Sequence, residues 1–189
     1  MSVGTLLSLL LLGFVAIGGA SIVFYTLENG ISPSPTPPRV RRALLDAVGG
    51  LDVSGTVCEL GSGWGTLAFP LARLLPDHTV IGFENSPVPF ACSALRLALS
   101  GLQNLDLKRV DFLRQDLSEA GLIIVYQSPG NMMTLRPKLE AELPDHAWVV
   151  SNTFAVPGWT PHQTLQVDDL YKTRIYLYQA GQAKPLRRK

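Results

Sequence analysis

Glu59-Leu60-Gly61-Ser62-Gly63-Trp64-Gly65 is the stretch that decides the fold of this 189-residue chain. It begins at the end of the short apolar run 56–60 and precedes a helical pattern at 66–75, so its three glycines stand where a strand gives way to a helix. Glycine lets the backbone approach a ligand closely, and the N-terminus of the following helix offers amide donors. Such a turn is typical of nucleotide-binding α/β proteins.

Outward from this turn the chain alternates strand and helix patterns. The expected strands are 56–60, 79–83, 105–110, 122–126, 147–154 and 174–178, the last as an edge or hairpin strand. The expected helices are 39–48, 66–75, 89–99 and 137–143, with Pro70 bending the second or lying near its first turn. This alternation predicts an α/β fold with a doubly wound, mostly parallel sheet, in which ligands bind at the carboxyl ends of the strands.

The glycine spacing separates two classes of nucleotide cofactor. A dinucleotide-binding turn has the pattern Gly-x-Gly-x-x-Gly, whereas here the third glycine comes one residue early and Glu59 precedes the first by two residues. A carboxylate at this place would repel a pyrophosphate but could hold an ammonium. A cofactor with a positively charged amino-acid end, such as S-adenosylmethionine, fits better, and a nicotinamide-dependent oxidoreductase is disfavoured.

Acidic residues after the next two strands fit the same cofactor. Glu84, followed by Asn85, ends the second strand and is placed to accept hydrogen bonds from the ribose hydroxyls, because an ionised carboxylate only accepts. Asp111 could accept from the adenine amino group while Phe112 packs on the base. The other predicted cofactor contacts in the glycine turn are Glu59, Gly61, Ser62, Gly63 and Gly65.

Composition and charge disfavour several other classes. Sixteen basic residues face 15 acidic ones, so the chain has no excess positive charge for a polyanion, and nucleic acid is not expected as a partner. Cys58 and Cys92 are far apart, with no CxxC pattern and no histidine at ligand spacing. Neither a disulfide framework nor a metal site is expected.

The N-terminal segment is predicted to cross a membrane. Residues 1–27 carry no charged side chain, and the 21 residues of 5–25 are long enough, at about 1.5 Å each, to span the hydrocarbon core of a bilayer. Basic residues soon after the segment favour a single-pass protein whose body lies on the cytoplasmic side. A cleaved signal peptide with its small residues at 18–20 is the alternative.

These patterns divide the chain into four parts. The expected parts are the anchor 1–27, a proline-rich linker 28–38, the α/β domain 39–180 and a basic tail 181–189.

Beyond these patterns, the chain resembles class I S-adenosylmethionine-dependent methyltransferases over roughly residues 35–180, through the turn at 59–65 together with Glu84. It is more specifically similar to the membrane-anchored protein-lysine methyltransferases related to those that modify the ATP synthase c-subunit and the adenine nucleotide translocase. The segments behind this likeness are 35–37, 131–140 and 150–159. The family commonly has Asp where this chain has Trp64.

The resemblance implies a Rossmann-like methyltransferase that uses S-adenosylmethionine and modifies lysine in a protein substrate embedded in a membrane. In this family the segment before the first helix of the domain closes over the cofactor, so Thr36 is implied as a cofactor contact. Two other readings stay open. One is a methyltransferase acting on a lipid or a small hydrophobic molecule, and the other is a non-catalytic cofactor-binding membrane module.

The methyl-transfer site is expected after the fourth strand. Gln127 and Ser128 could accept hydrogen bonds from an amine. Tyr126, Phe154 and Trp159 could surround a lysine head through cation–π contacts.

Overall fold

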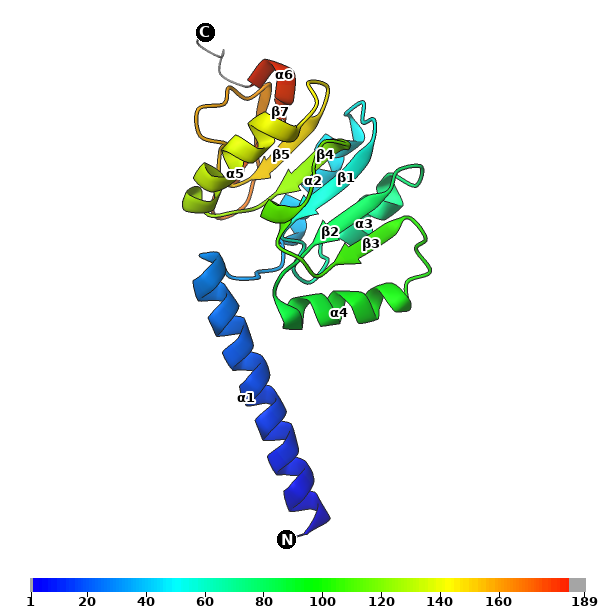
Figure 1. Ribbon diagram of the computed structural model, residues 1–189, viewed down its shortest axis with the longest axis vertical. Helices are drawn as coiled ribbons and strands as arrows, with labels where there is room; N and C mark the ends of the chain where they lie inside the picture. Colours follow the sequence, from blue (N-terminus) through cyan, green and yellow to red (C-terminus); the bar gives the residue numbers. More distant parts are fainter. Residues whose placement is uncertain (1, 184–189) are drawn as a thin grey trace.

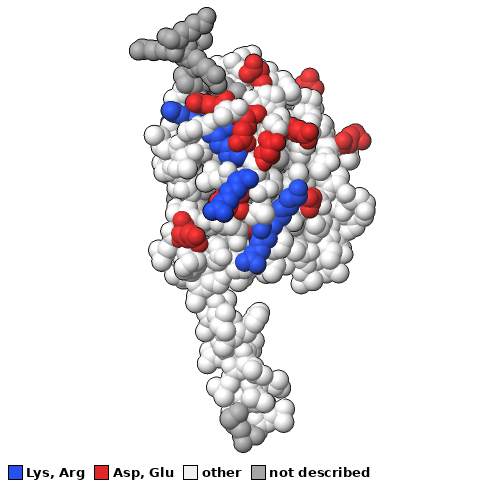
Figure 2. Space-filling view, in the orientation of Figure 1, with Lys and Arg blue, Asp and Glu red and all other residues white. Residues whose placement is uncertain are grey.

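The computed structural model describes residues 2–183 and consists of a long N-terminal helix and an α/β body (Figure 1). The helix α1 (Val3–Asn29) projects from one end of the body. It is long and apolar enough to cross a membrane, and none of its residues is fully buried. In Figure 2 the coloured Lys, Arg, Asp and Glu side chains gather on the body, and the part of the helix that projects beyond it shows none of them.

The body is built on a seven-stranded sheet with the order β3-β2-β1-β4-β5-β7-β6. Its first five strands are parallel, and β7 runs antiparallel to both β5 and β6. The strands are β1 (Thr56–Leu60), β2 (Val80–Phe83), β3 (Leu105–Lys108), β4 (Ala120–Val125), β5 (Trp148–Asn152), β6 (Gln163–Gln166) and β7 (Arg174–Gln179). The predicted doubly wound, mostly parallel α/β fold is confirmed, and the chain reverses its direction across the sheet between β1 and β4.

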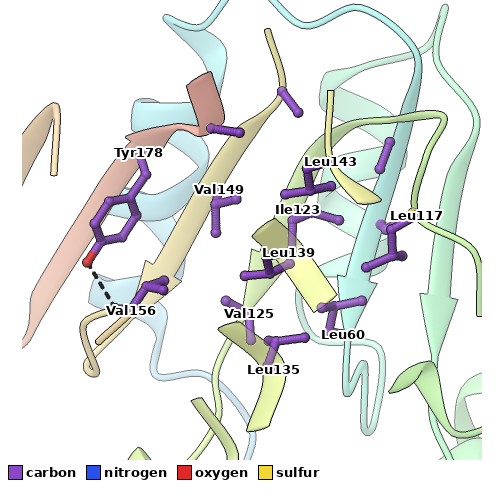
Figure 3. Close-up of a cluster of buried hydrophobic side chains, with 14 of the residues drawn as sticks. Leu60, Leu117, Ile123, Val125, Leu135, Leu139, Leu143, Val149, Val156 and Tyr178 are labelled. Carbon is purple, nitrogen blue, oxygen red and sulfur yellow. Dashed lines mark hydrogen bonds between the residues drawn. The ribbon is translucent and has the colours of Figure 1, made fainter. Parts of the chain in front are cut away.

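Helices cover both faces of this sheet. The helices of the body are α2 (Pro38–Gly49), α3 (Ala68–Leu74), α4 (Pro87–Ala98), α5 (Pro129–Glu142) and α6 (Ala180–Ala183), with a 3-10 turn η1 (Phe112–Arg114). One buried cluster joins α2 and α3 to the sheet, and the other joins α5 to the opposite face. Figure 3 shows this second cluster, in which Leu135 and Leu139 of α5 lie over Ile123 of β4.

Two elements differ from the sequence-based prediction. The helix expected at 137–143 begins eight residues earlier, at Pro129, because Ser128 caps it by accepting a hydrogen bond from the Asn131 amide at 3.4 Å. The strand β6 was not predicted, and it forms the sheet edge, so β7 is a hairpin strand inside that edge. Most of the predicted basic tail lies outside the described residues.

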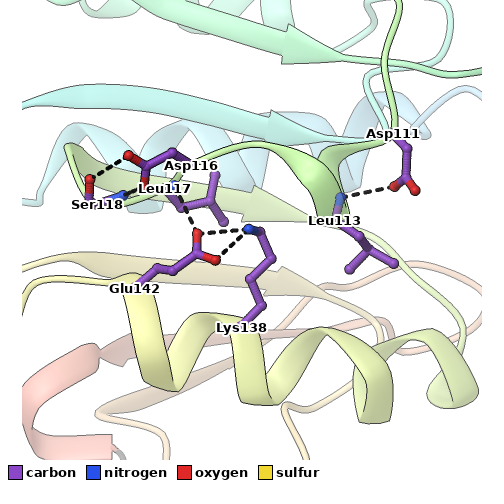
Figure 4. A network of polar contacts seen from close by, with 7 residues as sticks. All are labelled: Asp111, Leu113, Asp116, Leu117, Ser118, Lys138 and Glu142. Carbon is purple, nitrogen blue, oxygen red and sulfur yellow. Dashed lines mark hydrogen bonds and ion pairs between the residues drawn. The ribbon is translucent and has the colours of Figure 1, made fainter.

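A polar network ties α5 to the segment that follows β3 (Figure 4). The ammonium of Lys138 contacts both carboxylate oxygens of Glu142 at 2.6 and 2.7 Å, and Glu142 also accepts from the Leu117 amide at 3.0 Å. The same segment carries Asp111 at the start of η1. The contact therefore fixes the loop after β3 relative to α5.

Candidate active site

A cavity of about 320 Å³ lies at the carboxyl ends of β1, β2 and β4, where the direction of the chain changes. Its floor comes from the turn after β1 and from the residues that end β2 and β4. Its outer wall comes from the end of α1 and from residues 30–37, which we call the strap because they connect α1 to α2. The sheet thus brings together segments that are far apart in the sequence.

Glu59 is a buried ionisable group in this cavity. It is buried at 5% exposure, and its Oε2 has no hydrogen-bond partner among the residues that the structure describes. Burial raises the pKa of the Glu59 carboxyl well above its usual value, the Ala68 amide lowers it, and nearby Glu84 raises it further. A buried acceptor of this kind favours a ligand that brings a positive charge.

Glu84 is held in one orientation at the end of β2. Its Oε2 accepts from the Gly63 amide at 2.7 Å, and its Oε1 accepts from the Ser86 amide at 2.7 Å. Gly63 has φ 51°, in the left-handed region that favours glycine. Each carboxylate oxygen keeps a second acceptor direction, so Glu84 can accept from a pair of ligand hydroxyls.

The remaining predicted cofactor residues form the sides of the cavity. Asp111 and Phe112 both line it, and Asp111 uses Oδ1 to accept from the Leu113 amide at 2.9 Å (Figure 4). Gly61, Ser62, Asn85 and Thr36 also line it. Gly65 does not line the cavity.

Gln127 is a buried polar residue in the wall of the cavity that follows β4. Gln127 is buried at 6% exposure, and its Oε1 accepts from Asn131 Nδ2 at 2.9 Å. Its Nε2 donates to the Leu60 carbonyl at 3.5 Å. Gly61 has φ 84°, and a Cβ there would lie 2.7 Å from Gln127 Nε2, so the turn and this side chain are closely fitted.

The three aromatic residues predicted to surround a lysine head do not all lie at the cavity. Tyr126 lines the cavity and Phe154 stacks behind it, with ring centroids 6.1 Å apart. Trp159 is placed in the core instead, where its Nε1 donates to Glu140 at 3.1 Å and its ring packs edge-on against Tyr178. Ser128 caps α5 and does not line the cavity. The prediction that Trp159 and Ser128 face the substrate is not supported by these positions, because both are used in packing and capping.

Sequence reasoning missed the polar residues that connect the outer wall to Gln127. Asn131 Nδ2 also donates to the Asn29 carbonyl at 2.6 Å. Asn29 and Asn85 exchange two side-chain hydrogen bonds, at 2.9 and 2.8 Å. The sequence signal that could have indicated the contact of Asn131 with Gln127 is the Ser128-Pro129 helix start, because it places position 131 one helical turn after Gln127.

The strap is fixed by two contacts with the glycine turn. The indole N–H of Trp64 donates to the Pro33 carbonyl, and the Thr36 amide donates to Thr66 Oγ1 at 3.3 Å. Trp64 itself lines the cavity. Trp64, which stands where related methyltransferases commonly have Asp, therefore connects the glycine turn to the strap.

Comparison with known proteins finds similarity to methyltransferases. A family model described as the ANTKMT methyltransferase domain matches residues 59–163. A protein-lysine N-methyltransferase of Saccharolobus islandicus is 27% identical over 152 residues, which cover 79% of this chain and 94% of that protein. The adenine nucleotide translocase lysine N-methyltransferase of Mus musculus is 32% identical over 108 residues, which cover 57% of this chain and 47% of that protein.

Among solved structures, the chain is similar to an RNA methyltransferase from Salinibacter ruber in complex with S-adenosyl-L-homocysteine. The TM-score is 0.68 at 26% identity, covering 81% of this chain and 97% of that one.

Proposed function

The chain belongs to the family of the ANTKMT methyltransferase domain and is an S-adenosylmethionine-dependent methyltransferase, and from that premise we propose that it methylates the side-chain amine of lysine in proteins. The Saccharolobus islandicus relative supports lysine as the acceptor, since nearly its whole length, 94%, is matched. We further propose that the enzyme is a single-pass membrane protein with its body on the cytoplasmic side, and that its substrate is a membrane protein. The length and composition of α1 support the anchor.

The residues of the cavity fit S-adenosylmethionine. The unpartnered Oε2 of buried Glu59 suits the ammonium of the methionine part. The carboxylate of Glu84 suits the ribose hydroxyls. Asp111 and Phe112 suit the adenine. When bound, the cofactor supplies a methyl group that is activated by the positive charge on its sulfur.

One observation carries the choice of an amine as the acceptor. Gln127 is buried beside the glycine turn with its Oε1 held by Asn131, and Tyr126, the residue before it, also lines the cavity. The amide oxygen keeps a second lone pair for an N–H of the incoming amine, and the aromatic face favours its positive charge before the proton leaves to water. The main contribution of the protein is to align the amine with the methyl group of the cofactor.

The proposal is tested with the full chain in lipid nanodiscs and cofactor carrying an isotopically labelled methyl group. Nanodiscs that also contain a detergent-solubilised membrane-protein fraction are expected to yield methylated lysine by peptide mass spectrometry. Gln127→Leu is expected to keep cofactor binding and lose turnover. Gln103→Leu serves as its matched control, because Gln103 is exposed and does not line the cavity.

Two outcomes would contradict the proposal. Label found in the lipid extract and absent from protein would identify a lipid methyltransferase. Cofactor binding with no label in either fraction would identify a non-catalytic binding module.

Glu59 makes cofactor binding dependent on pH. The ammonium of the ligand favours the ionised carboxylate, whereas burial in the free protein favours the neutral one. Below the raised pKa of Glu59, binding is therefore expected to release up to about one proton, and affinity is expected to rise with pH until Glu59 is ionised in the free protein. If Glu59 is still neutral there, the rise ends where the amino group of the ligand loses its own proton, at about pH 7.7–8.

This expectation is checked by calorimetric titration in two buffers with different ionisation enthalpies. The proton release follows from the difference between the two apparent enthalpies. Glu59→Gln is expected to weaken binding and to abolish the proton release. Proton release that persists in Glu59→Gln would assign the titration to another group.

A further inference from the structure

Helix α4 presents an apolar face that none of the described residues 2–183 covers. The exposed residues of the helix and its C-cap are Ala91, Cys92, Leu95, Arg96, Ala98 and Leu99. Leu95 is 66% exposed and Leu99 is 81% exposed. Arg96 is the one charged residue in α4, and its guanidinium lies 4.0 Å from the centre of the Phe69 ring in α3. The cation is thus drawn toward the body, and the rest of the exposed face is uncharged.

The contact of α4 with α1 indicates which environment surrounds the exposed face of α4. The two helices are in contact, and α4 lies at the edge of the body from which α1 projects (Figure 1). Asn29 at the end of α1 hydrogen-bonds to Asn85 and to Ser86, the residue that precedes α4. Ser21, Ile22 and Tyr25 of α1 are half-buried at helical spacing, so the last two turns of α1 form its contact face.

The contact with α1 also determines how deep α4 lies relative to the bilayer. With residues 5–25 crossing the hydrocarbon core, the turns from Ser21 to Asn29 stand at the boundary between hydrocarbon and headgroups. An element packed against these turns lies at the same boundary. Helices with a broad apolar face are stable there, in the plane of the interface.

We propose that the exposed face of α4, formed by Ala91, Cys92, Leu95 and Leu99, is a second membrane-binding surface that inserts into the bilayer interface beside α1. This inference rests on the proposed anchor. Together the two helices would fix the body in one orientation, with the cavity and the strap facing the membrane surface. A lysine close to the headgroups would then be within reach of Gln127.

Cys92 gives direct access to this surface. It is exposed, whereas Cys58 is buried and burial raises the pKa of its thiol to about 12, so an environment-sensitive maleimide probe will label Cys92 selectively. In the full chain in vesicles of phosphatidylcholine, this probe is expected to be quenched by lipids with a spin label near the headgroup and to be shielded from aqueous iodide. A matched probe at Leu74→Cys, in a Cys92→Ser background, is expected to show the reverse, because position 74 is exposed on α3.

Further variants separate failure of this inference from failure of the anchor. A probe at Ala16→Cys, in the Cys92→Ser background, reports on the middle of α1, and with the anchor in place it is expected to be quenched by lipids that carry a spin label deep in the acyl chain. The pair Leu95→Glu and Leu99→Glu changes only exposed side chains and is expected to return the Cys92 probe to iodide quenching without a loss of cofactor binding.

The outcomes are distinct. Lipid quenching at position 16 with free iodide quenching at Cys92 would overturn the inference and leave the anchor in place. Loss of lipid quenching at both positions would overturn the anchor as well. Shielding of Cys92 from iodide without lipid quenching would show that a protein surface covers α4, which also overturns the inference.

Discussion

Glu84→Gln is expected to lower the affinity for S-adenosylmethionine by at least about a hundredfold. Each oxygen of Glu84 already accepts a backbone N–H, from Gly63 and from Ser86 at 2.7 Å. An amide in its place must oppose one of these donors with its own NH₂ group, and it loses acceptor capacity for a ribose hydroxyl. Hydrogen bonds to charged groups are worth about 1.5–3 kcal/mol each, so two of them account for the loss.

The measurement is calorimetric titration of the full chain in nanodiscs with the cofactor and with its demethylated product. Glu119→Gln is the matched control, because that side chain is exposed and outside the cavity. An unchanged melting temperature in Glu84→Gln separates lost binding from lost folding. Affinity within a few-fold of the wild type would remove Glu84 from the cofactor site.

Gly121→Ala is expected to destabilise the body by about 3–5 kcal/mol or to prevent folding. A Cβ at position 121 would lie 1.6 Å from the carbonyl oxygen of Ser54 and 2.5 Å from its carbon, so the backbone before β1 or at the start of β4 must shift. Both strands are central in the sheet, and such a shift disturbs their pairing.

Gly130→Ala is the control for this substitution. A Cβ there meets no atom within 4 Å, and the residue lies in the first turn of α5, so the change is expected to leave stability equal or to raise it by about 0.5–1 kcal/mol. Thermal unfolding followed by circular dichroism compares the two variants. Equal melting temperatures for Gly121→Ala and the wild type would contradict the close approach of these two segments.

The parallel part of the fold was predictable because its strands are short apolar runs that end in turn residues. The run 122–126 is apolar throughout, which predicts a buried central strand, and β4 is indeed buried along its whole length. In contrast, Gln163–Gln166 has only Leu165 as an apolar residue, and that side chain is half-buried. Its pairing with β7 is a tertiary effect with no local signal.

The cofactor half of the site was more predictable than the acceptor half for a similar reason. Glu59 and Glu84 follow strands directly, so strand order alone brings them to one edge. Asn29 and Asn131 meet only because the end of α1 returns to α5, across about a hundred residues of sequence. Trp159 was assigned to the acceptor because an aromatic residue of the core and one of a binding cage look alike in sequence.

If α1 is anchored as proposed, the strap would link the thickness of the bilayer to the cofactor cavity. Pro33 and Thr36 complete the wall of the cofactor cavity, and they are joined to α1 through only a few residues. A hydrophobic segment that is longer or shorter than the surrounding hydrocarbon changes its tilt. Any tilt that favours the observed contacts of the strap with Trp64 and Thr66 would raise cofactor affinity, and by linkage a bound cofactor would restrain the tilt to the same extent in free energy. With the proposed anchor in place, the enzyme would be coupled to the mechanical state of its membrane.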